Sequence, residues 1–213
     1  MNKDLKRRII ELSYEHKLSH LGSCLTAVDI LAEIYLTKAP GEDVVLSQGH
    51  AGLALYAVIE KHHGVDAAML LEKHGVHPNR DPENYISCSA GSLGQGLPIA
   101  LGMALADRSK NVYCLISDGE SAEGSIWEAL RIKTLNKIDN LKVYANLNGF
   151  SAYDPVNGDF LVPNLVNFDP EINLRATTDN SYAYELPFLV GVDAHYYTMT
   201  EEDYNQAMGI YAS

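Results

Sequence analysis

Apolar residues in the first 150 positions follow helical spacing in some stretches and form short continuous runs in others. Leu5, Ile9 and Leu12 recur every three to four residues, which predicts an amphipathic helix that extends to about Leu18. Similar stretches predict further helices at residues 27–36, 51–63, 66–73, 95–107 and 123–136. Thr26 is the expected N-cap of the first of these.

Three short apolar runs alternate with these helices and predict β-strands at residues 44–46, 111–116 and 141–145. Strands that alternate with helices build a parallel sheet covered by helices on both faces, so the expected fold class is α/β. Residues 75–92 contain Pro78, Pro82 and Gly91 and predict a long loop. Long loops inside compact domains tend to be functional.

The overall composition narrows the class of protein. The chain has 213 residues, with 16 Lys and Arg against 28 Asp and Glu, a formal charge of −12. This acidic balance argues against nucleic-acid binding and against a polybasic membrane surface. The three cysteines are far apart and favour a reducing compartment. The charged N-terminus lacks the apolar core of a signal peptide, and residues 84–106 are too polar to span a membrane, so we expect a soluble, cytoplasmic protein.

Residues 151–213 differ in composition from the rest of the chain. They hold one cation, Arg175, against ten carboxylates, and seven of the thirteen tyrosines. Two interpretations stay open: a docking surface for a partner, or a solvated acidic face, which is the commoner meaning of a charge run.

Two polar side chains follow neighbouring predicted strands. The strand at 111–116 runs into Ser117, Asp118 and Gly119, and the next strand leads to Asn148. Because ligands bind beyond the carboxyl ends of parallel strands, we expect Asp118 and Asn148 to meet at one edge of the sheet. Carboxylate and amide oxygens suit a partial Mg²⁺ site whose remaining ligands come from a bound phosphate. The alternative is an ordinary helix-capping Asp and an Asn-Gly turn.

Five segments of the chain resemble motifs of the transketolase family, in the family's order. These segments are SHLGS at 19–23, LSQGH at 46–50, AGSLGQG at 90–96, GESAEGSIWEA at 119–129, and the thiamine diphosphate motif that joins Asp118 to Asn148. The resemblance covers about the first 160 residues. It implies a thiamine diphosphate-binding fold, with a pyrophosphate-binding domain at 1–160 and a divergent, acidic, Tyr-rich extension of that domain at 161–213.

The resemblance also implies roles for individual residues. The implied metal ligands for Mg²⁺ are Asp118, Asn148 and the carbonyl of Phe150. The implied cofactor-binding residues are Gly91, Leu93, Asp118, Gly119, Glu120 and Asn148. The implied catalytic residues are His20, His50 and His77, which would face the reacting centre and sugar hydroxyls, and Glu123, which would join a carboxylate network across a dimer. Neutral imidazoles suit such proton transfer near pH 7.

The sequence departs from the family in three places. Ser117 stands where the family has glycine, residues after 160 follow the family poorly, and residues 190–195 only faintly resemble a late family segment that ends in His. The family's pyrimidine-binding domain, with the glutamate that activates the cofactor, has no counterpart in these 213 residues. We therefore expect the N-terminal subunit of a split transketolase-like enzyme, a hetero-oligomer or dimer of heterodimers that acts on sugar phosphates.

Two other functions stay open. Ser117 and the acidic tail are compatible with a non-catalytic thiamine diphosphate or assembly module. A subunit of a 2-oxo acid-type thiamine enzyme is the other alternative, although three histidine-bearing segments favour sugar chemistry.

Overall fold

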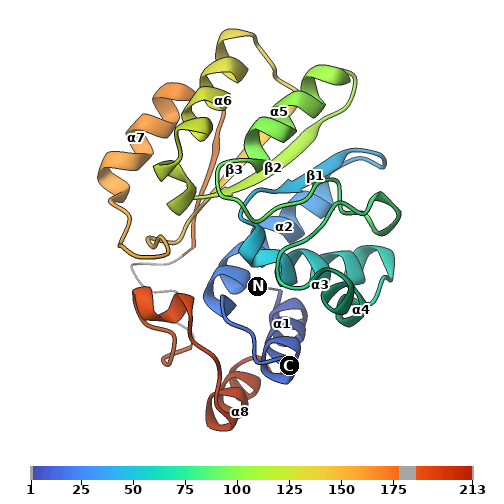
Figure 1. Cartoon of the computed structure of the whole chain (residues 1–213), viewed down its shortest axis with the longest axis vertical. Helices are drawn as coiled ribbons and strands as arrows, with labels where there is room; N and C mark the ends of the chain where they lie inside the picture. The colour runs from blue at the N-terminus through green and yellow to red at the C-terminus, as the bar shows by residue number, and fades with distance from the viewer. Residues whose placement is uncertain (1, 178–185, 213) are drawn as a thin grey trace.

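The computed structural model describes residues 2–177 and 186–212. Within them, a parallel sheet has the strand order β1-β2-β3-β4 (Figure 1). The strands are β1 (Asp43–Leu46), β2 (Val112–Ser117), β3 (Leu141–Leu147) and β4 (Asn173–Ala176). Strands that alternate with helices confirm the predicted α/β class. The strand β4 was not predicted, because its half-exposed residues form no apolar run.

One face of the sheet is covered by α5 (Gly96–Ala106), α6 (Gly124–Leu135) and α7 (Gly158–Phe168), drawn above the sheet in Figure 1. The helices α6 and α7 each join neighbouring parallel strands, and such crossovers are right-handed, so both fall on the same face. Val112, Cys114 and Ile116 of β2 point into this layer and are buried there.

The opposite face carries α1 (Lys3–Glu15), α2 (Leu21–Thr37), α3 (Gly52–His63) and α4 (Ala67–His74). Tyr113 and Leu115 of β2 point into this second layer, as the two-residue period of a strand requires. Most residues of α2 are buried, because the helix lies between the sheet and the other helices of this layer (Figure 1).

The C-terminal segment, residues 186–212, packs on this second layer. Leu186 and Leu189 are fully buried in the same apolar cluster as α1 and α2. The helix α8 (Glu201–Ile210) lies along α1, where the Tyr14 and Tyr204 rings stack with centroids 4.4 Å apart. Both ends of the described chain therefore lie beside α1 (Figure 1). The boundary expected at 160 stays a prediction, and part of the expected extension, residues 178–185, lies outside the described residues.

Two helix boundaries differ from the sequence prediction. The helix α1 ends at Glu15, and Lys17 has a positive φ of 51° that stops the helix before Leu18. The helix α2 begins at Leu21, six residues earlier than predicted. Thr26 is consequently inside α2, where its Oγ1 donates to the carbonyl oxygen of Ser23 instead of capping the helix. Burial of the first turns of α2 against the core overrides the local capping preference.

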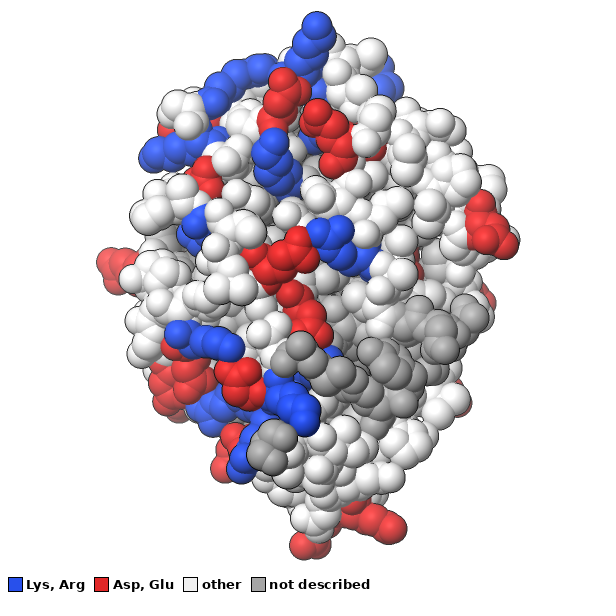
Figure 2. All heavy atoms as spheres, turned by 180° about the vertical axis from the view of Figure 1, so that it is seen from behind, with Lys and Arg blue, Asp and Glu red and all other residues white. Residues whose placement is uncertain are grey.

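The distribution of surface charge and the apolar character of the helices bear on nucleic-acid binding and on membrane insertion. On the face shown in Figure 2, acidic and basic side chains are interspersed, without one continuous basic patch. Among the described residues, no helix combines the length and the apolar character that crossing a bilayer requires.

Candidate functional site

The carboxyl ends of β2 and β3 bring Asp118 and the Asn148–Gly149 segment together. Ser117, the last residue of β2, pairs with Asn146 of β3, so the next residues of both strands leave the sheet side by side. Asp118 Oδ2 accepts a hydrogen bond of 2.7 Å from the Gly149 N–H, and Oδ1 accepts one of 2.9 Å from the Gly119 N–H. The two strand ends are thus joined directly at Asp118.

Asp118 is a buried carboxyl group whose pKa is higher than usual. Its residue is 2% exposed, and burial raises its pKa to about 7, although the N–H groups of Gly149, Gly119 and Asn148 favour the charged form. A buried carboxylate is stable only with compensating charge or hydrogen bonds. A cation bound beside Asp118 would supply that charge.

Asn148 and Phe150 place two more oxygens in this region. Asn148 is buried, and its Oδ1 accepts a 3.0 Å hydrogen bond from the Phe150 N–H. A Cβ added at Gly119 would lie 3.1 Å from Ser151 Cα, a tight contact, and 3.6 Å from the Phe150 carbonyl oxygen, so Gly119 packs closely against this loop. In the described part of the chain, His, Cys, Asp and Glu alone form no group of three that could hold a metal. A metal here would need the amide and carbonyl oxygens, and such hard oxygens fit Mg²⁺.

Glu120 accepts hydrogen bonds from three other parts of the chain. Its carboxylate is fully buried in the short helix η3 (Gly119–Ala122). Oε1 accepts from Ser47 Oγ at 2.6 Å and from the Gly94 N–H at 2.9 Å, and Oε2 accepts from the Ser117 N–H at 3.0 Å. Burial raises the pKa of this carboxyl group. Glu120 therefore links three of the motif segments, and its contact with a cofactor stays a prediction.

The loop at residues 90–94 lies between His77 on one side and Glu120 and Glu123 on the other. A Cβ added at Gly91 would lie 3.2 Å from the His77 ring, and one at Gly94 would lie 2.6 Å from Glu123 Cβ. Gly91 also has a positive φ of 151°, which L side chains rarely adopt. Leu93 is half-buried in the same loop. Glu123 is exposed at the N-terminus of α6, and its predicted role across a dimer stays a prediction.

Four histidines from four separate segments converge. The ring centroids of His20 and His50 lie 5.6 Å apart, and the His195 ring lies 4.5 Å from His20 and 5.5 Å from His50. His77 is close enough to act electrostatically on both His20 and His50. We call His20, His50, His77 and His195 the histidine cluster.

His195 was not among the predicted site residues. It ends the short helix η4 (Val192–His195), and its carbonyl oxygen accepts a 3.0 Å hydrogen bond from the His20 N–H. The signal in the sequence was the faint family likeness of residues 190–195, but no spacing rule connects that segment to His20. The C-terminal segment thereby contributes directly to the cluster.

Three imidazoles of the cluster, those of His20, His50 and His195, have lowered pKa values that favour the neutral form near pH 7. Burial, with a smaller contribution from neighbouring histidines, lowers the pKa of His20 to about 4 and that of His50 to about 3. Burial also lowers the pKa of His195, whose Nδ1 has no hydrogen-bond partner among the described residues. Ser19 Oγ lies 2.8 Å from His20 Nδ1 and orients that ring. Neutral imidazoles at this density can accept and donate protons to oxygens of a substrate.

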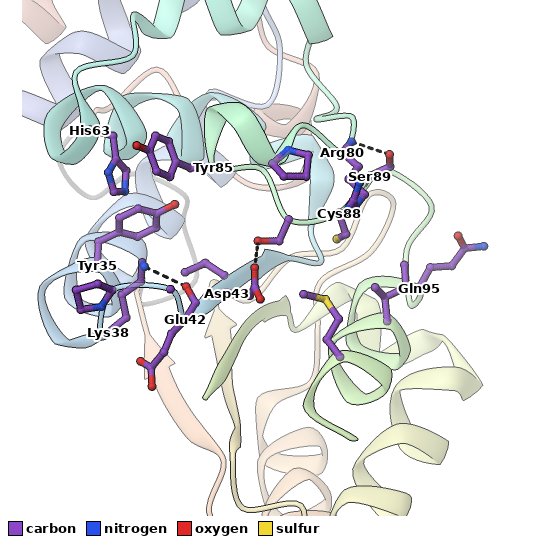
Figure 3. Close-up of a pocket in the computed structure, with 17 residues that line it drawn as sticks. Tyr35, Lys38, Glu42, Asp43, His63, Arg80, Tyr85, Cys88, Ser89 and Gln95 are labelled. Atoms are coloured by element: carbon purple, nitrogen blue, oxygen red, sulfur yellow. Dashed lines mark hydrogen bonds between the residues drawn. The ribbon is translucent and has the colours of Figure 1, made fainter. Parts of the chain in front are cut away.

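A cavity of about 820 Å³ lies away from this site, beside the edge strand β1 (Figure 3). Its lining includes none of the predicted site residues. The His63 and Tyr85 rings stack on one side with centroids 3.7 Å apart, and Asp43 Oδ1 accepts from Ser87 Oγ at 2.7 Å. The cavity flanks the amino end of β1, whereas the histidine cluster and Asp118 follow the carboxyl ends of strands.

Comparisons with known proteins show which family the chain resembles. A family model described as 1-deoxy-D-xylulose-5-phosphate synthase matches residues 1–166. Human transketolase is 35% identical over 156 residues, which cover 64% of this chain and 25% of that protein. A transketolase family protein from Sinorhizobium fredii is 32% identical over 191 residues, which cover 78% of this chain and 64% of that protein.

Solved structures show the same fold over nearly the whole chain. Transketolase from Campylobacter jejuni superposes with a TM-score of 0.79 at 20% identity, over 98% of this chain and 42% of that one. A transketolase variant from Pichia stipitis gives a TM-score of 0.80 at 16% identity, over 99% and 40%. The chain spans only about a quarter of the human enzyme. Since the family model covers most of its length, the protein belongs to the family of transketolase and 1-deoxy-D-xylulose-5-phosphate synthase N-terminal domains.

Proposed function

We propose that the chain is the thiamine diphosphate- and Mg²⁺-binding subunit of a split transketolase-like enzyme. The reaction is transfer of a ketol unit between sugars or sugar phosphates. A partner subunit supplies the pyrimidine-binding domain, and the assembly is a dimer of heterodimers in the cytoplasm. The cysteines are unpaired, as that compartment requires.

One observation supports the proposal most strongly. The loop at 90–94 touches His77 through Gly91 and reaches Glu120 and Glu123 through Gly94. This loop therefore connects the histidine cluster to the Asp118 region. A cation-dependent anchor for a diphosphate and a set of proton-transferring imidazoles are the two parts that sugar chemistry on thiamine diphosphate needs.

Each part has its own task in this proposal. The cofactor, when bound, supplies the nucleophilic carbon that cleaves and forms carbon–carbon bonds. Asp118, Asn148 and the Phe150 carbonyl hold Mg²⁺, and Gly119 lets the diphosphate approach the backbone. Gly91 and Leu93 line the cofactor by their main chain. His20, His50 and His77 move protons to and from substrate oxygens, and His195 joins them in that work.

The split arrangement rests on relatives of different size. The chain matches 25% of human transketolase but 64% of the Sinorhizobium fredii protein, so short members of the transketolase family exist. We infer that residues 151–213 dock the partner, because part of this acidic segment packs beside the histidine cluster.

A non-catalytic assembly module is the second candidate. The motivating observation is Ser117, which replaces a family glycine beside the expected diphosphate. Its Oγ accepts a 3.3 Å hydrogen bond from the Glu120 N–H, and its residue is 5% exposed. The hydroxyl is therefore engaged within the protein, and this geometry favours the catalytic proposal. A 2-oxo acid-type thiamine subunit is a third candidate. The four clustered histidines favour sugar chemistry over this candidate.

The test combines binding and turnover. The full chain, with a pyrimidine-domain subunit that co-purifies with it, is titrated with thiamine diphosphate and Mg²⁺ by calorimetry and assayed with ketose donors and aldose acceptors. We expect Asp118-dependent binding and ketol transfer only in the complex. Binding without turnover of any sugar pair would leave the assembly module as the function. Turnover of a 2-oxo acid without an aldose would establish the third candidate.

A further inference from the structure

The cavity of about 820 Å³ beside β1 is separate from the candidate site and has the size of a ligand pocket. Protein cavities that bind small molecules usually span about 300–1,000 Å³. Its walls come from the C-terminal end of α2, the segment that leads into β1, residues 80–89 and α5. Neither Asp118 nor any member of the histidine cluster lines it. A molecule bound here would therefore be neither the cofactor nor the substrate of the proposed function.

Three aromatic rings form one side of the cavity (Figure 3). The His63 and Tyr85 rings stack with centroids 3.7 Å apart and an angle of 8° between their planes, and the Tyr35 ring lies 5.9 Å from the His63 ring. Tyr85 is 45% exposed, so part of its ring stays open to a ligand. Its backbone has a positive φ of 65°, a costly conformation for a bulky residue that persists only where surrounding contacts fix it. Flat heterocyclic rings stack on such a surface.

Arg80 supplies a cation on another side of the cavity (Figure 3). Its backbone N–H donates a 2.8 Å hydrogen bond to Ser89 Oγ, but its guanidinium group has no hydrogen bond or ion pair among the described residues. Lys38 is engaged, because its Nζ donates to the Glu42 carbonyl oxygen at 3.0 Å and lies 5.5 Å from the centre of the Tyr35 ring. A guanidinium group binds phosphate through two parallel hydrogen bonds, so Arg80 is the anion-binding group that the cavity offers.

The two carboxylates in the lining have different partners. Both oxygens of Glu42 already accept hydrogen bonds from neighbouring donors, at 2.7 and 2.6 Å. Asp43 Oδ1 accepts from Ser87 Oγ at 2.7 Å, and Oδ2 has no hydrogen-bond partner in the described part of the chain. In the view of Figure 3, Asp43 lies between the aromatic rings and Arg80. A carboxylate oxygen at that place suits the hydroxyl groups of a sugar, which donate hydrogen bonds.

Residues 78–90 form a ribbon that joins this cavity to the candidate site. Backbone hydrogen bonds of 2.9 and 3.0 Å close the ribbon between Asp81 and Ile86, and one of 2.9 Å closes it from the Ala90 N–H to the Pro78 carbonyl oxygen. The middle of the ribbon lines the cavity, and its first residue follows His77 of the histidine cluster. A ligand that holds the middle of the ribbon therefore restrains the segment next to the candidate site.

We propose that the cavity binds a nucleoside monophosphate. The base lies against the ring of Tyr85, the ribose hydroxyls meet Asp43, and the phosphate binds the guanidinium group of Arg80. A nucleoside monophosphate carries the three matching groups in that order: a flat ring, a hydroxylated linker and an anion. Binding is independent of the proposed function, because it uses no residue of the Asp118 region or of the histidine cluster.

Calorimetry on the full chain tests these contacts separately. The probes are adenosine 5′-monophosphate, adenosine, which lacks the anion, and inorganic phosphate, which lacks the ring. We expect the nucleotide alone to bind measurably, and its Kd to rise about tenfold, which corresponds to about 1.4 kcal/mol, in Arg80→Gln and in Tyr85→Asn. Asparagine tolerates a positive φ, so the second variant removes the ring without adding backbone strain. Arg131→Gln and Tyr153→Asn, at exposed positions outside the cavity, are the matched controls.

Other results would overturn the assignment. Equal affinity for adenosine or for phosphate alone would remove the nucleotide as the ligand, and unchanged affinity in both cavity variants would remove the cavity as the site. Loss of nucleotide binding in Asp118→Asn would move the nucleotide to the candidate cofactor site. Absence of binding of the adenine, guanine, cytosine and uracil nucleoside monophosphates would overturn the proposal as a whole.

Hydrogen exchange locates the ligand on the chain. Nucleotide binding should slow the exchange of the Ile86 and Ala90 amide protons, which close the ribbon, by several-fold. Binding that leaves both rates unchanged would contradict a ligand held by the ribbon. Neither measurement needs ketol transfer, so failure of the proposed function would leave the nucleotide site untouched, and failure of the nucleotide site would leave the proposed function untouched.

Discussion

The two halves of the candidate site are built in different ways. The Asp118 half comes from two neighbouring strand ends, and its contacts are hydrogen bonds to backbone N–H groups. The histidine half draws one imidazole each from four segments between residues 20 and 195, and the rings of His20, His50 and His195 contact one another. Strand pairing alone therefore builds the first half, whereas the second requires nearly the whole chain to fold.

This difference means that the two halves can be perturbed separately. A change at Asp118 should act on cofactor affinity and leave the imidazoles in place. A change in the histidine cluster should act on turnover and leave the diphosphate anchor in place. Glu120, which bridges neighbouring segments, should act on stability.

The largest effect is expected at the Asp118 half. Asp118→Asn keeps the size of the side chain but removes the charge that we propose for Mg²⁺. Loss of outer-shell partners of a metal costs about 10–100-fold in affinity, so we expect a loss of more than about 100-fold in Mg²⁺-dependent thiamine diphosphate binding, measured by calorimetry. Asp154→Asn, an exposed carboxylate on the neighbouring loop, is the control. Equal affinities in the two variants would remove Asp118 from the anchor.

The next largest effect is expected in the histidine cluster. His50→Gln removes a proton carrier and should lower kcat of the assembled enzyme by about 10²–10⁴-fold, the usual contribution of general acid–base catalysis. Cofactor affinity should stay at the wild-type value, which distinguishes this half from the Asp118 half. His16→Gln, on an exposed surface, should behave as the wild type. A matching loss of cofactor affinity in His50→Gln would show that the halves are not separable.

A smaller effect is expected at Glu120, which links the motif segments that contain Ser47 and Gly94. Ser47→Ala removes the 2.6 Å hydrogen bond to Glu120 and leaves a buried carboxylate with one partner fewer. We expect the free energy of unfolding, measured with urea, to fall by about 1–3 kcal/mol. Ser109→Ala removes a bond of the same length to Asp107 on the surface and should change it by less than about 0.5 kcal/mol. Equal losses would mean that burial does not strengthen the Glu120 contacts.

The last expected effect is a pH dependence of the free energy of unfolding, and it belongs to the histidine half. The unfolded chain protonates His20 and His50 near 6.5, but the folded chain protonates them only near 4 and 3. Between those values the unfolded chain binds more protons, so the free energy of unfolding falls as the pH falls from 7 to about 5. The double variant His20→Gln, His50→Gln should show a flatter dependence. The same slope in both proteins would contradict neutral, buried imidazoles.

The sequence predicts the Asp118 half better than the histidine half. Asp118 and Asn148 follow apolar strands, and parallel pairing of those strands is a local consequence of the helix–strand alternation. His195 lies in a segment without apolar periodicity, and its place depends on the packing of residues 186–199 against α1 and α2. Such long-range packing leaves no spacing pattern in the sequence.

Three features of the fold, the helix α8, the strand β4 and the start of α2, were not predicted from the sequence, each for a different reason. The helix α8 has a capping box, in which Thr200 and Asp203 bond each other's backbone N–H, and that pattern was readable in the sequence. The strand β4 has no apolar run, because its residues are only half-buried at the edge of the sheet. The early start of α2 depends on burial of its first turns, which outweighs the local preference of Thr26 for a cap.

The hydrogen bond from the His20 N–H to the His195 carbonyl turns one amide proton into a reporter. When the C-terminal segment detaches from α2, that proton becomes exposed to exchange with deuterated water, while the helical amides of α2 stay protected. The exchange rate at His20 thus measures how often the tail releases its histidine, and a docked partner subunit that clamps the tail would slow it.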